Sequence, residues 1–206
     1  MLREQQQEEL NMNANSQGKT RRLAGLALFT ALIVILQLLG SFIRVGPVSV
    51  SLVALPIVVG AAVYGSAAGL WLGFVFGVVV LLSGDAAAFF AFSVPGTLIT
   101  VLLKGVACGG LAGLVYAWLR GKNRTLAAVA AAIVCPVVNT GVFLLGCRVF
   151  FMPMLAEMAQ KFGFGDHVGR FMIFGLVGIN FLAELGVNVV LSPVILRLIR
   201  LGRKEN

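Results

Sequence analysis

Residues 45–84 read VGPVSVSLVALPIVVGAAVYGSAAGLWLGFVFGVVVLLSG and contain no charged side chain. A transmembrane helix needs about 20 predominantly apolar residues. This stretch is twice that length, so it predicts two spanning helices joined by a tight turn. Tyr64-Gly65-Ser66 is the natural place for the turn. The two spans are then expected at 48–63 and 67–82.

The composition of the whole chain also indicates a membrane protein. Of its 206 residues, 59% are hydrophobic and 12% are charged, and the mean hydropathy is +0.99. A soluble domain carries about 25% charged residues, so a surface this poor in charge must face lipid. The net charge of +8 does not indicate nucleic acid, because most cations lie between or beyond the apolar stretches.

Four more apolar stretches are long enough to cross a bilayer. Together they predict an all-α integral membrane protein, a six-transmembrane-helix bundle over residues 20–200. Residues 1–19 are expected to form a disordered polar cytosolic tail, and residues 201–206 a basic one. The loop after the fifth span is expected to hold a short interfacial helix at 154–162. The four stretches are 23–42, 96–119, 126–150 (with Pro136 inside) and 171–199, kinked or ended near Pro193.

The distribution of cations orients the bundle. With the N-terminus in the cytosol, the excess of Lys and Arg falls on the cytosolic side, as the positive-inside rule requires. Both termini are then cytosolic, and this placement requires an even number of spans. The cytosolic cations are Lys19, Arg21, Arg22, Arg120, Lys122, Arg124, Arg197, Arg200, Arg203 and Lys204.

Polar side chains at membrane depth are costly and often mark function. Lys104, Asn139 and Glu184 each lie roughly 20 Å from the inner end of their helix, at 1.5 Å of rise per residue. We therefore expect a polar pocket in the outer half of the bundle, between the fourth, fifth and sixth spans. A buried Lys104–Glu184 ion pair with a purely structural role is the alternative. The candidate substrate-binding residues are Arg44, Asp85, Lys104, Asn139, Thr140, Arg148, Asn180 and Glu184.

Several kinds of chemistry lack their motifs in this sequence. One histidine and three scattered cysteines offer no zinc site. There is no Gly-x-Ser-x-Gly hydrolase motif and no Walker A motif, so neither an enzyme nor ATP hydrolysis by this chain is expected. No cofactor or metal is predicted.

The overall pattern resembles the substrate-binding S component of an energy-coupling factor (ECF) transporter. The likeness covers roughly residues 20–200. It lies in the six spans, in Ala27-Leu-Phe-Thr-Ala31 on the first helix, in the short second span through Pro56, and in Gly60–Gly69 before a glycine-spaced third helix. The runs Gly46–Ser51, Gly84-Asp85 and Pro136–Gly141 look most similar to the pantothenate-type group.

This resemblance implies a mechanism. An S component captures a vitamin at the outer face of the cell membrane and delivers it inward when docked on a transmembrane coupling subunit. Two ATPase subunits of the same module supply the energy. In this family the small residues of the first helix face the coupling subunit, so the resemblance assigns the docking role to Ala27 and Ala31. Arg44, Lys104 or Arg148 would meet the carboxylate of pantothenate, while riboflavin or folate are the alternative vitamins.

Two other classes of function are alternatives to a binding subunit. A self-sufficient small secondary transporter or channel would need transport by this chain alone, although no convincing inverted repeat is visible. A lipid-modifying membrane enzyme is the weakest alternative, because no catalytic constellation is present.

Overall fold

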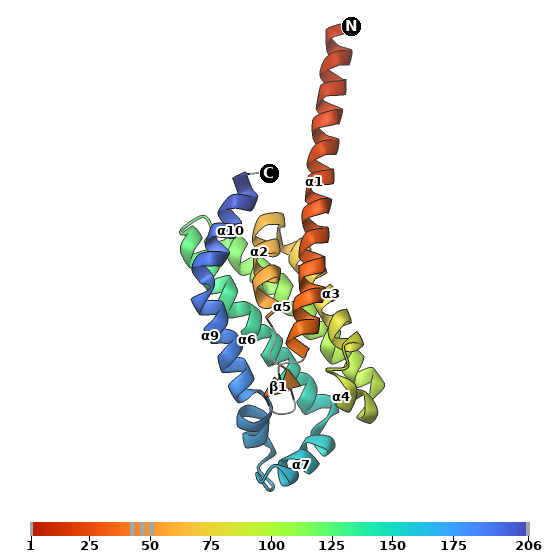
Figure 1. The fold of residues 1–206 in the computed structure, drawn as a ribbon, viewed down its shortest axis with the longest axis vertical. Coiled ribbons are helices and arrows are strands. Elements are labelled where there is room, and N and C mark those ends of the chain that lie inside the picture. The colour runs from red at the N-terminus through yellow and green to blue at the C-terminus, as the bar shows by residue number, and fades with distance from the viewer. Residues whose placement is uncertain (1, 42–43, 46–47, 50–51, 205–206) are drawn as a thin grey trace.

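The computed structural model describes residues 2–41, 44–45, 48–49 and 52–204, most of which are helical (Figure 1). The elements follow in this order: α1 (Leu2–Ser41), β1 (Arg44–Val45), β2 (Val48–Ser49), α2 (Ala54–Tyr64), α3 (Ser66–Leu82), α4 (Ala87–Phe92), α5 (Val94–Leu119), α6 (Arg124–Phe150), α7 (Met152–Lys161), α8 (Val168–Arg170), the π-helical η1 (Phe171–Gly178), α9 (Ile179–Val190) and α10 (Ser192–Lys204).

Three helical stretches are long and apolar enough to cross a membrane: residues 18–41 of α1, α5 and α6. The bent pair 168–178 and 180–190 raises that number to four within the described part of the chain. Helices α2 and α3 are apolar but shorter. The structure is thus an all-helical membrane fold with three to four candidate spans, together with one small β-hairpin.

The turn between α2 and α3 lies where the sequence predicts it. Gly65 ends α2 with φ of +95°, a conformation that a residue with a Cβ adopts only with strain, and α3 begins at Ser66. The expected start of the preceding span at Val48 is wrong. Val48 and Ser49 instead form strand β2, which pairs antiparallel with Arg44 and Val45. Alternating Val and Ser suits a strand, so α2 starts only at Ala54 and rises about 16 Å.

The N-terminal segment also differs from the expectation of a disordered tail. Helix α1 runs from Leu2 to Ser41 without a break. Its first two turns are rich in Gln and Glu, which are good helix formers. No proline or glycine interrupts them before Gly18.

Helices α3 and α5 approach each other closely because glycines face glycines. A Cβ placed on Gly73 would overlap the carbonyl oxygen of Gly105, and one on Gly105 would overlap that of Gly73. Gly69 and Gly109 repeat the same relation one turn away. The four-residue spacing of the glycines therefore sets the distance between the two backbones.

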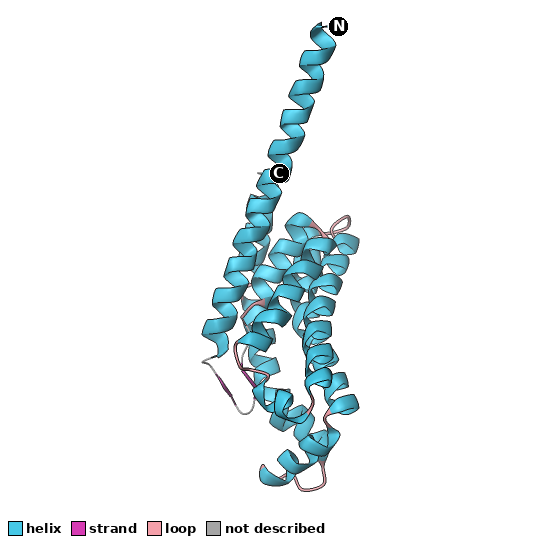
Figure 2. Cartoon of the chain, turned by 90° about the vertical axis from the view of Figure 1, so that its right-hand side faces the viewer, coloured by secondary structure: helices cyan, strands magenta, loops and turns pink. Residues whose placement is uncertain are grey.

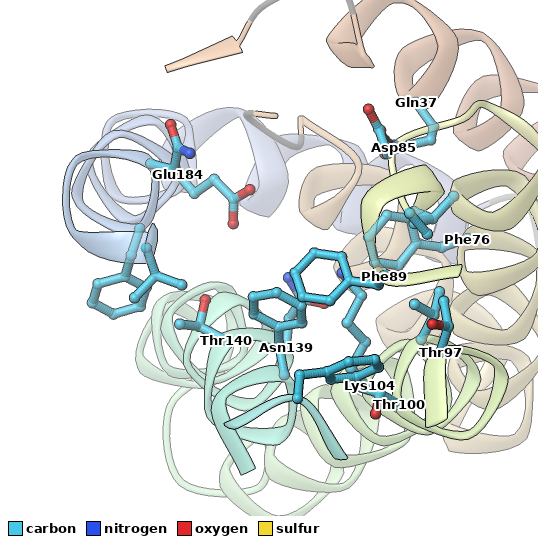
Figure 3. A pocket seen from close by; sticks show the side chains of 18 residues that line it. Gln37, Phe76, Asp85, Phe89, Thr97, Thr100, Lys104, Asn139, Thr140 and Glu184 are labelled. Atoms are coloured by element: carbon cyan, nitrogen blue, oxygen red, sulfur yellow. Dashed lines mark hydrogen bonds between the residues drawn. The ribbon is translucent and has the colours of Figure 1, made fainter. Parts of the chain in front are cut away.

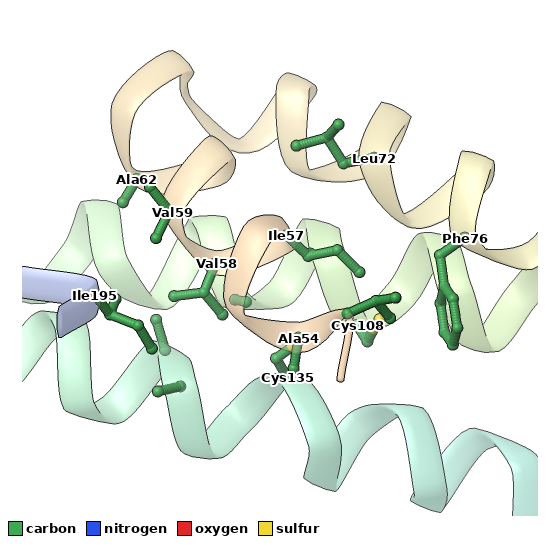
Figure 4. Packing of buried hydrophobic residues seen from close by; sticks show 14 of the residues in the cluster. Ala54, Ile57, Val58, Val59, Ala62, Leu72, Phe76, Cys108, Cys135 and Ile195 are labelled. Carbon is green, nitrogen blue, oxygen red and sulfur yellow. The ribbon is translucent and has the colours of Figure 1, made fainter. Parts of the chain in front are cut away.

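The main core lies where α2 packs between its neighbours. Ile57, Val58 and Val59 of α2 are at most 1% exposed. They contact Leu72 of α3 and the α5, α6 and α10 side chains that include Ile195, as Figure 4 shows. Three cysteines are buried as free thiols, Cys108 and Cys135 within this core.

The last predicted span is divided into segments rather than continuous. The π-helical η1 leads into α9, and the chain breaks at Leu191 before α10 begins at Ser192. The break lies two residues before Pro193, close to the position where the sequence predicts a kink or an end of the span. Proline suits the first turn of a helix, because the missing N–H has no partner there.

The two ends of the bundle differ in what they carry. The N-terminal end of α1, the α2–α3 turn, the α5–α6 turn and the end of α10 gather at one end (Figure 1). Arg22 Nη2 donates a 3.1 Å hydrogen bond to the Tyr64 carbonyl there. The hairpin, α4 and α7 lie at the opposite end, as Figure 2 also shows for the strands.

Candidate functional site

A cavity of about 70 Å³ lies between α3, α5, α6 and α9. Residues from α1, α4 and the loop before α4 complete its walls (Figure 3). Its lining is mixed, with three ionisable side chains, six neutral polar ones and several phenylalanines. The polar and charged members are Gln37, Asp85, Thr97, Thr100, Lys104, Asn139, Thr140, Asn180 and Glu184.

Helix α5 presents one regular face to the cavity. Thr97, Thr100, Val101 and Lys104 all line it, at the three- and four-residue spacing that places side chains on the same face of a helix. Ser93 caps the start of the helix by accepting a hydrogen bond from the backbone N–H of Gly96. Thr97 Oγ1 donates to the Ser93 carbonyl at 2.7 Å. The cap and this bond stabilise the first turn of α5, and the glycine contacts with α3 hold the helix against its neighbour.

Lys104 is held by aromatic rings. Its Nζ lies 5.5 Å from the ring centroid of Phe76 on α3 and 5.3 Å from that of Phe143 on α6. Among the described residues, these rings are the contacts that the structure shows for the ammonium. Cation–π attraction is worth about 0.5–2 kcal/mol at each ring. Glu184 and Asp85 line the same cavity as Lys104, and the structural Lys104–Glu184 pair stays an alternative prediction.

A hydrogen bond joins α1 to the cavity wall. Gln37 Nε2 donates to Asp85 Oδ2 at 2.7 Å, and Gln37 is only 2% exposed. Asp85 follows Gly84, whose φ of +82° turns the chain after α3. The bond therefore fixes the loop before α4 against the first helix.

Helices α6 and α9 supply the opposite wall. Asn139 and Thr140 come from α6, while Asn180 and Glu184 are one turn apart on α9 and are 5% and 7% exposed. Asn188 Nδ2 donates to the Glu184 carbonyl at 2.8 Å, which braces this turn of α9. Figure 3 shows Glu184 reaching from its helix toward the cavity.

Two buried oxygen atoms in the cavity wall lack a hydrogen-bond partner among the described residues. They are Thr100 Oγ1 and Asn139 Oδ1. Buried polar atoms in native proteins are almost always paired, and leaving one unpaired costs about 1–3 kcal/mol. A bound solute with polar groups would supply the missing partners.

Phenylalanines close the cavity toward the end that carries α4 and α7. The ring of Phe89 lies 5.5 Å from that of Phe143 and 5.1 Å from that of Phe151, both edge to face. Phe92 reaches Phe151 as well, at 6.2 Å. Phe151 is the residue between α6 and α7, so the amphipathic α7, which the sequence predicts as a short helix, begins directly at this cluster.

The structure brings together six of the eight residues predicted for substrate binding. Asp85, Lys104, Asn139, Thr140, Asn180 and Glu184 all line the cavity. Arg148 does not, because it lies on the exposed face of α6. Arg44 lies in β1, and its side chain is outside the described residues.

Sequence reasoning missed other residues that line the cavity: Gln37, Phe76, Phe89, Thr97, Thr100 and Phe143. The spacing of the two threonines in the sequence could have identified them, since they share the helix face of Lys104. No sequence feature could have identified the phenylalanines, because in an apolar span a ring that lines a cavity has the same sequence pattern as a ring that faces lipid.

The family model for the ECF transporter substrate-specific component matches residues 21–196. The chain belongs to this family. No curated protein matches it. The S component is therefore a multi-pass protein of the cell membrane and a transport subunit rather than an enzyme, and its function implies partnership with an ECF module.

The expected docking residues of this S component lie on the surface of the bundle. Ala27 and Ala31 are both exposed on α1, and the large apolar neighbours Leu28 and Ile35 are 62% and 53% exposed. The opposite face of α1 packs inward through Ile33 and Gln37, which are 0% and 2% exposed. The two small side chains thus lie among larger apolar ones on an exposed face of α1.

Proposed function

We propose that this S component captures a small vitamin from outside the cell in the cavity around Lys104 and delivers it inward when docked on its ECF module. The observation that carries this proposal is the cavity itself. It combines charged and amide groups with two buried oxygen atoms that lack partners, and such a lining is typical of a site for a polar solute.

The proposal includes a topology of six spans with both termini cytosolic. The additional spans are α2 and α3, which are short and apolar, and the bent η1–α9–α10 segment. The gathering of both termini and of the Arg120–Arg124 turn at one end of the bundle supports it (Figure 1). Cations at this end fit the positive-inside rule. The cavity and its phenylalanines then lie toward the outer face.

Pantothenate is our first candidate for the vitamin, with riboflavin and folate as alternatives. Its carboxylate would meet Lys104, which is the only lysine or arginine among the cavity-lining residues that the structure describes. Its hydroxyl and amide groups would bond to Asn139, Asn180 and Thr140.

Isothermal titration of the purified chain against a panel of vitamins tests this function. We expect one vitamin to bind in the absence of ATP and of partner subunits. A protein that binds none of them would refute vitamin capture. Uptake into liposomes that contain this chain alone, driven by an ion gradient, would instead favour a self-sufficient transporter.

The docking face is tested in the assembled transporter. We expect Ala27→Arg and Ala31→Arg to abolish vitamin uptake without weakening vitamin binding, since each places a long cation in the interface. Thr30→Arg is not a suitable control, because Thr30 Oγ1 accepts a hydrogen bond from Trp71. Leu145→Arg on the exposed face of α6 is the matched control. Unchanged uptake by both alanine variants would contradict the docking assignment.

A further inference from the structure

One end of the bundle, away from the cavity, carries exposed cations on the α5–α6 turn and on α10. This is the end where Arg22 donates to the Tyr64 carbonyl. Helix α10 reaches the same level, because a Cβ on Gly202 would lie 3.1 Å from Val63, the residue before Tyr64. The α5–α6 turn lies at this end as well (Figure 1). We name as the basic cluster the exposed cations of these two elements whose side chains the structure describes: Arg120, Lys122, Arg124, Arg197 and Arg200.

Packing places the two parts of the basic cluster on neighbouring helices. Helix α10 packs against α2 and α6. Its buried Ile195 and Ile199 belong to the same core as Ala127, which lies about one turn after Arg124, the first residue of α6. The cations of α10 and those of the α5–α6 turn therefore belong to one surface at this end of the bundle.

The carboxylates that the structure describes lie away from the basic cluster. Glu9, the last acid on α1, is 13 residues before Arg22, which is about 20 Å along the helix. That distance is at least twice the Debye length of about 8–10 Å, so Glu9 is largely screened from the cluster. The other described carboxylates line the cavity or lie at the opposite end: Asp85, Glu157, Asp166 and Glu184. The basic cluster therefore draws its counter-ions mainly from outside the chain.

Exposed apolar side chains accompany these cations. On α10, Ile195 and Ile199 are buried in the core, whereas Leu198 and Leu201 are 38% and 53% exposed. Trp118, in the last turn of α5, is 76% exposed. A helix that exposes leucines beside arginines suits the boundary between acyl chains and headgroups, and tryptophan is enriched at the same depth. The surface around the basic cluster thus combines the two chemistries of a phospholipid.

We propose that the basic cluster binds the headgroups of anionic phospholipids. Their phosphate oxygens accept the charge-assisted hydrogen bonds that arginine and lysine donate, and their acyl chains lie against Trp118, Leu198 and Leu201. A free anion would satisfy the cations but not the apolar side chains beside them. The positive-inside rule concerns only the orientation of a chain, whereas this inference assigns a bound lipid to a particular surface. It stands apart from vitamin capture, because it uses no residue of the cavity.

The fluorescence of Trp118 measures lipid selectivity beside the basic cluster. The chain has two tryptophans, so Trp71→Phe in the full chain leaves Trp118 as the only one. This variant is placed in phosphatidylcholine vesicles that contain increasing fractions of phosphatidylglycerol, with bromine on the acyl chains of one lipid or the other. Bromine quenches tryptophan on contact, so the two series give the binding constant of phosphatidylglycerol relative to phosphatidylcholine at this site.

The expected ratio follows from the number of cations that meet one headgroup. Each contributes about 1 kcal/mol, which is about fivefold in affinity, so two cations favour phosphatidylglycerol about 25-fold. Arg120→Gln together with Lys122→Gln should lower the ratio to about 5 or less. Lys161→Gln together with Arg170→Gln removes two exposed cations at the opposite end, and should leave the ratio unchanged. Because exposed charges are screened by salt, the ratio should also fall as NaCl is raised.

The possible outcomes separate a lipid from other anionic ligands. Equal quenching by the two brominated lipids, or an equal fall of the ratio in the cluster variant and the control variant, would overturn the proposal. Displacement of phosphatidylglycerol by inorganic phosphate at constant ionic strength would indicate a site for free anions and overturn it too. If the cluster variant kept the ratio but bound the ECF module less tightly, an acidic protein surface would be the ligand instead. A cluster variant that does not fold is replaced by Arg197→Gln together with Arg200→Gln, with the same expected fall.

Discussion

The contact between α3 and α5 leads to a graded prediction for stability. A Cβ on Gly73 would overlap the carbonyl oxygen of Gly105, so Gly73→Ala must move one backbone away from the other. At Gly77 the nearest atom to an added Cβ is the Val101 carbonyl oxygen at 3.1 Å, which needs a shift of only a few tenths of an ångström. At Gly141 nothing lies within 4 Å. Gly141→Ala is therefore the matched control on a helix.

The size of the effect follows from two opposing terms. Overpacking of a close contact costs about 1–3 kcal/mol, while replacing Gly by Ala within a helix gains up to about 1 kcal/mol. We expect a net loss of about 1–2 kcal/mol for Gly73→Ala, a change near zero for Gly77→Ala and a small gain for Gly141→Ala. For a chain of this length, each kcal/mol shifts the Tm by about 2–4 °C.

Thermal unfolding in one detergent measures this series. The three cysteines are buried free thiols, so a thiol-reactive fluorophore reports the exposure of the core as the protein unfolds. The expected order of Tm is Gly141→Ala above Gly77→Ala above Gly73→Ala. If Gly73→Ala unfolded at the same temperature as Gly141→Ala, the reasoning from backbone contact would be refuted.

Three further substitutions have expected outcomes. Asn123→Ala removes the side chain that caps α6 by accepting from two backbone N–H groups, and should cost about 0.5–2 kcal/mol, measured as a lower Tm. Gln37→Leu removes the donor that binds Asp85 at 2.7 Å, and should cost about 1–3 kcal/mol, measured as a lower Tm, since a buried acceptor loses a partner. Phe89→Ala removes a ring that contacts two others, and should cost about 3–5 kcal/mol, with a larger fall in Tm than Asn123→Ala.

The ends of the middle helices could be predicted because simple signals mark them. A charge-free stretch of twice the span length, interrupted once at Tyr64-Gly65-Ser66, predicted α3 to within one residue. Helix α5 ends at Leu119, directly before Arg120, and α6 ends at Phe150, as the apolar stretches indicated. Apolar length and turn residues are local properties, and they are retained in the fold.

The hairpin and the segmented last helix could not be predicted in the same way. Hydropathy does not distinguish a strand from a helix in a short apolar run, so Val48 and Ser49 were included in a span. The π-helical η1 also packs against a residue outside it, since a Cβ on Gly175 would meet the ring of Phe164 as well as that of Phe171. A sequence pattern does not show that contact.

The sequence predicted the charged residues of the cavity but missed its phenylalanines, the threonines of α5 and Gln37. Charged and amide side chains at membrane depth are rare, so Lys104 and Glu184 are conspicuous in the sequence. Gln37 was overlooked because it lies alone on α1, and its meaning depends on Asp85, 48 residues away. The role of a polar residue that acts through a partner far away in the sequence can be recognised only once the structure shows the contact.

The hydrogen bond between Gln37 and Asp85 also connects the two proposed functions of the chain. Gln37 is on the same helix as Ala27 and Ala31, about 9 Å along its axis from Ala31, and it faces the cavity while they face outward. Asp85 lines the same cavity. A solute that competes with Gln37 for Asp85 would therefore loosen α1 from the cavity wall, and one that binds both groups would tighten it. Binding and docking should thus be linked in energy, and by reciprocity the coupling subunit should change the affinity for the solute by the same factor that the solute changes docking.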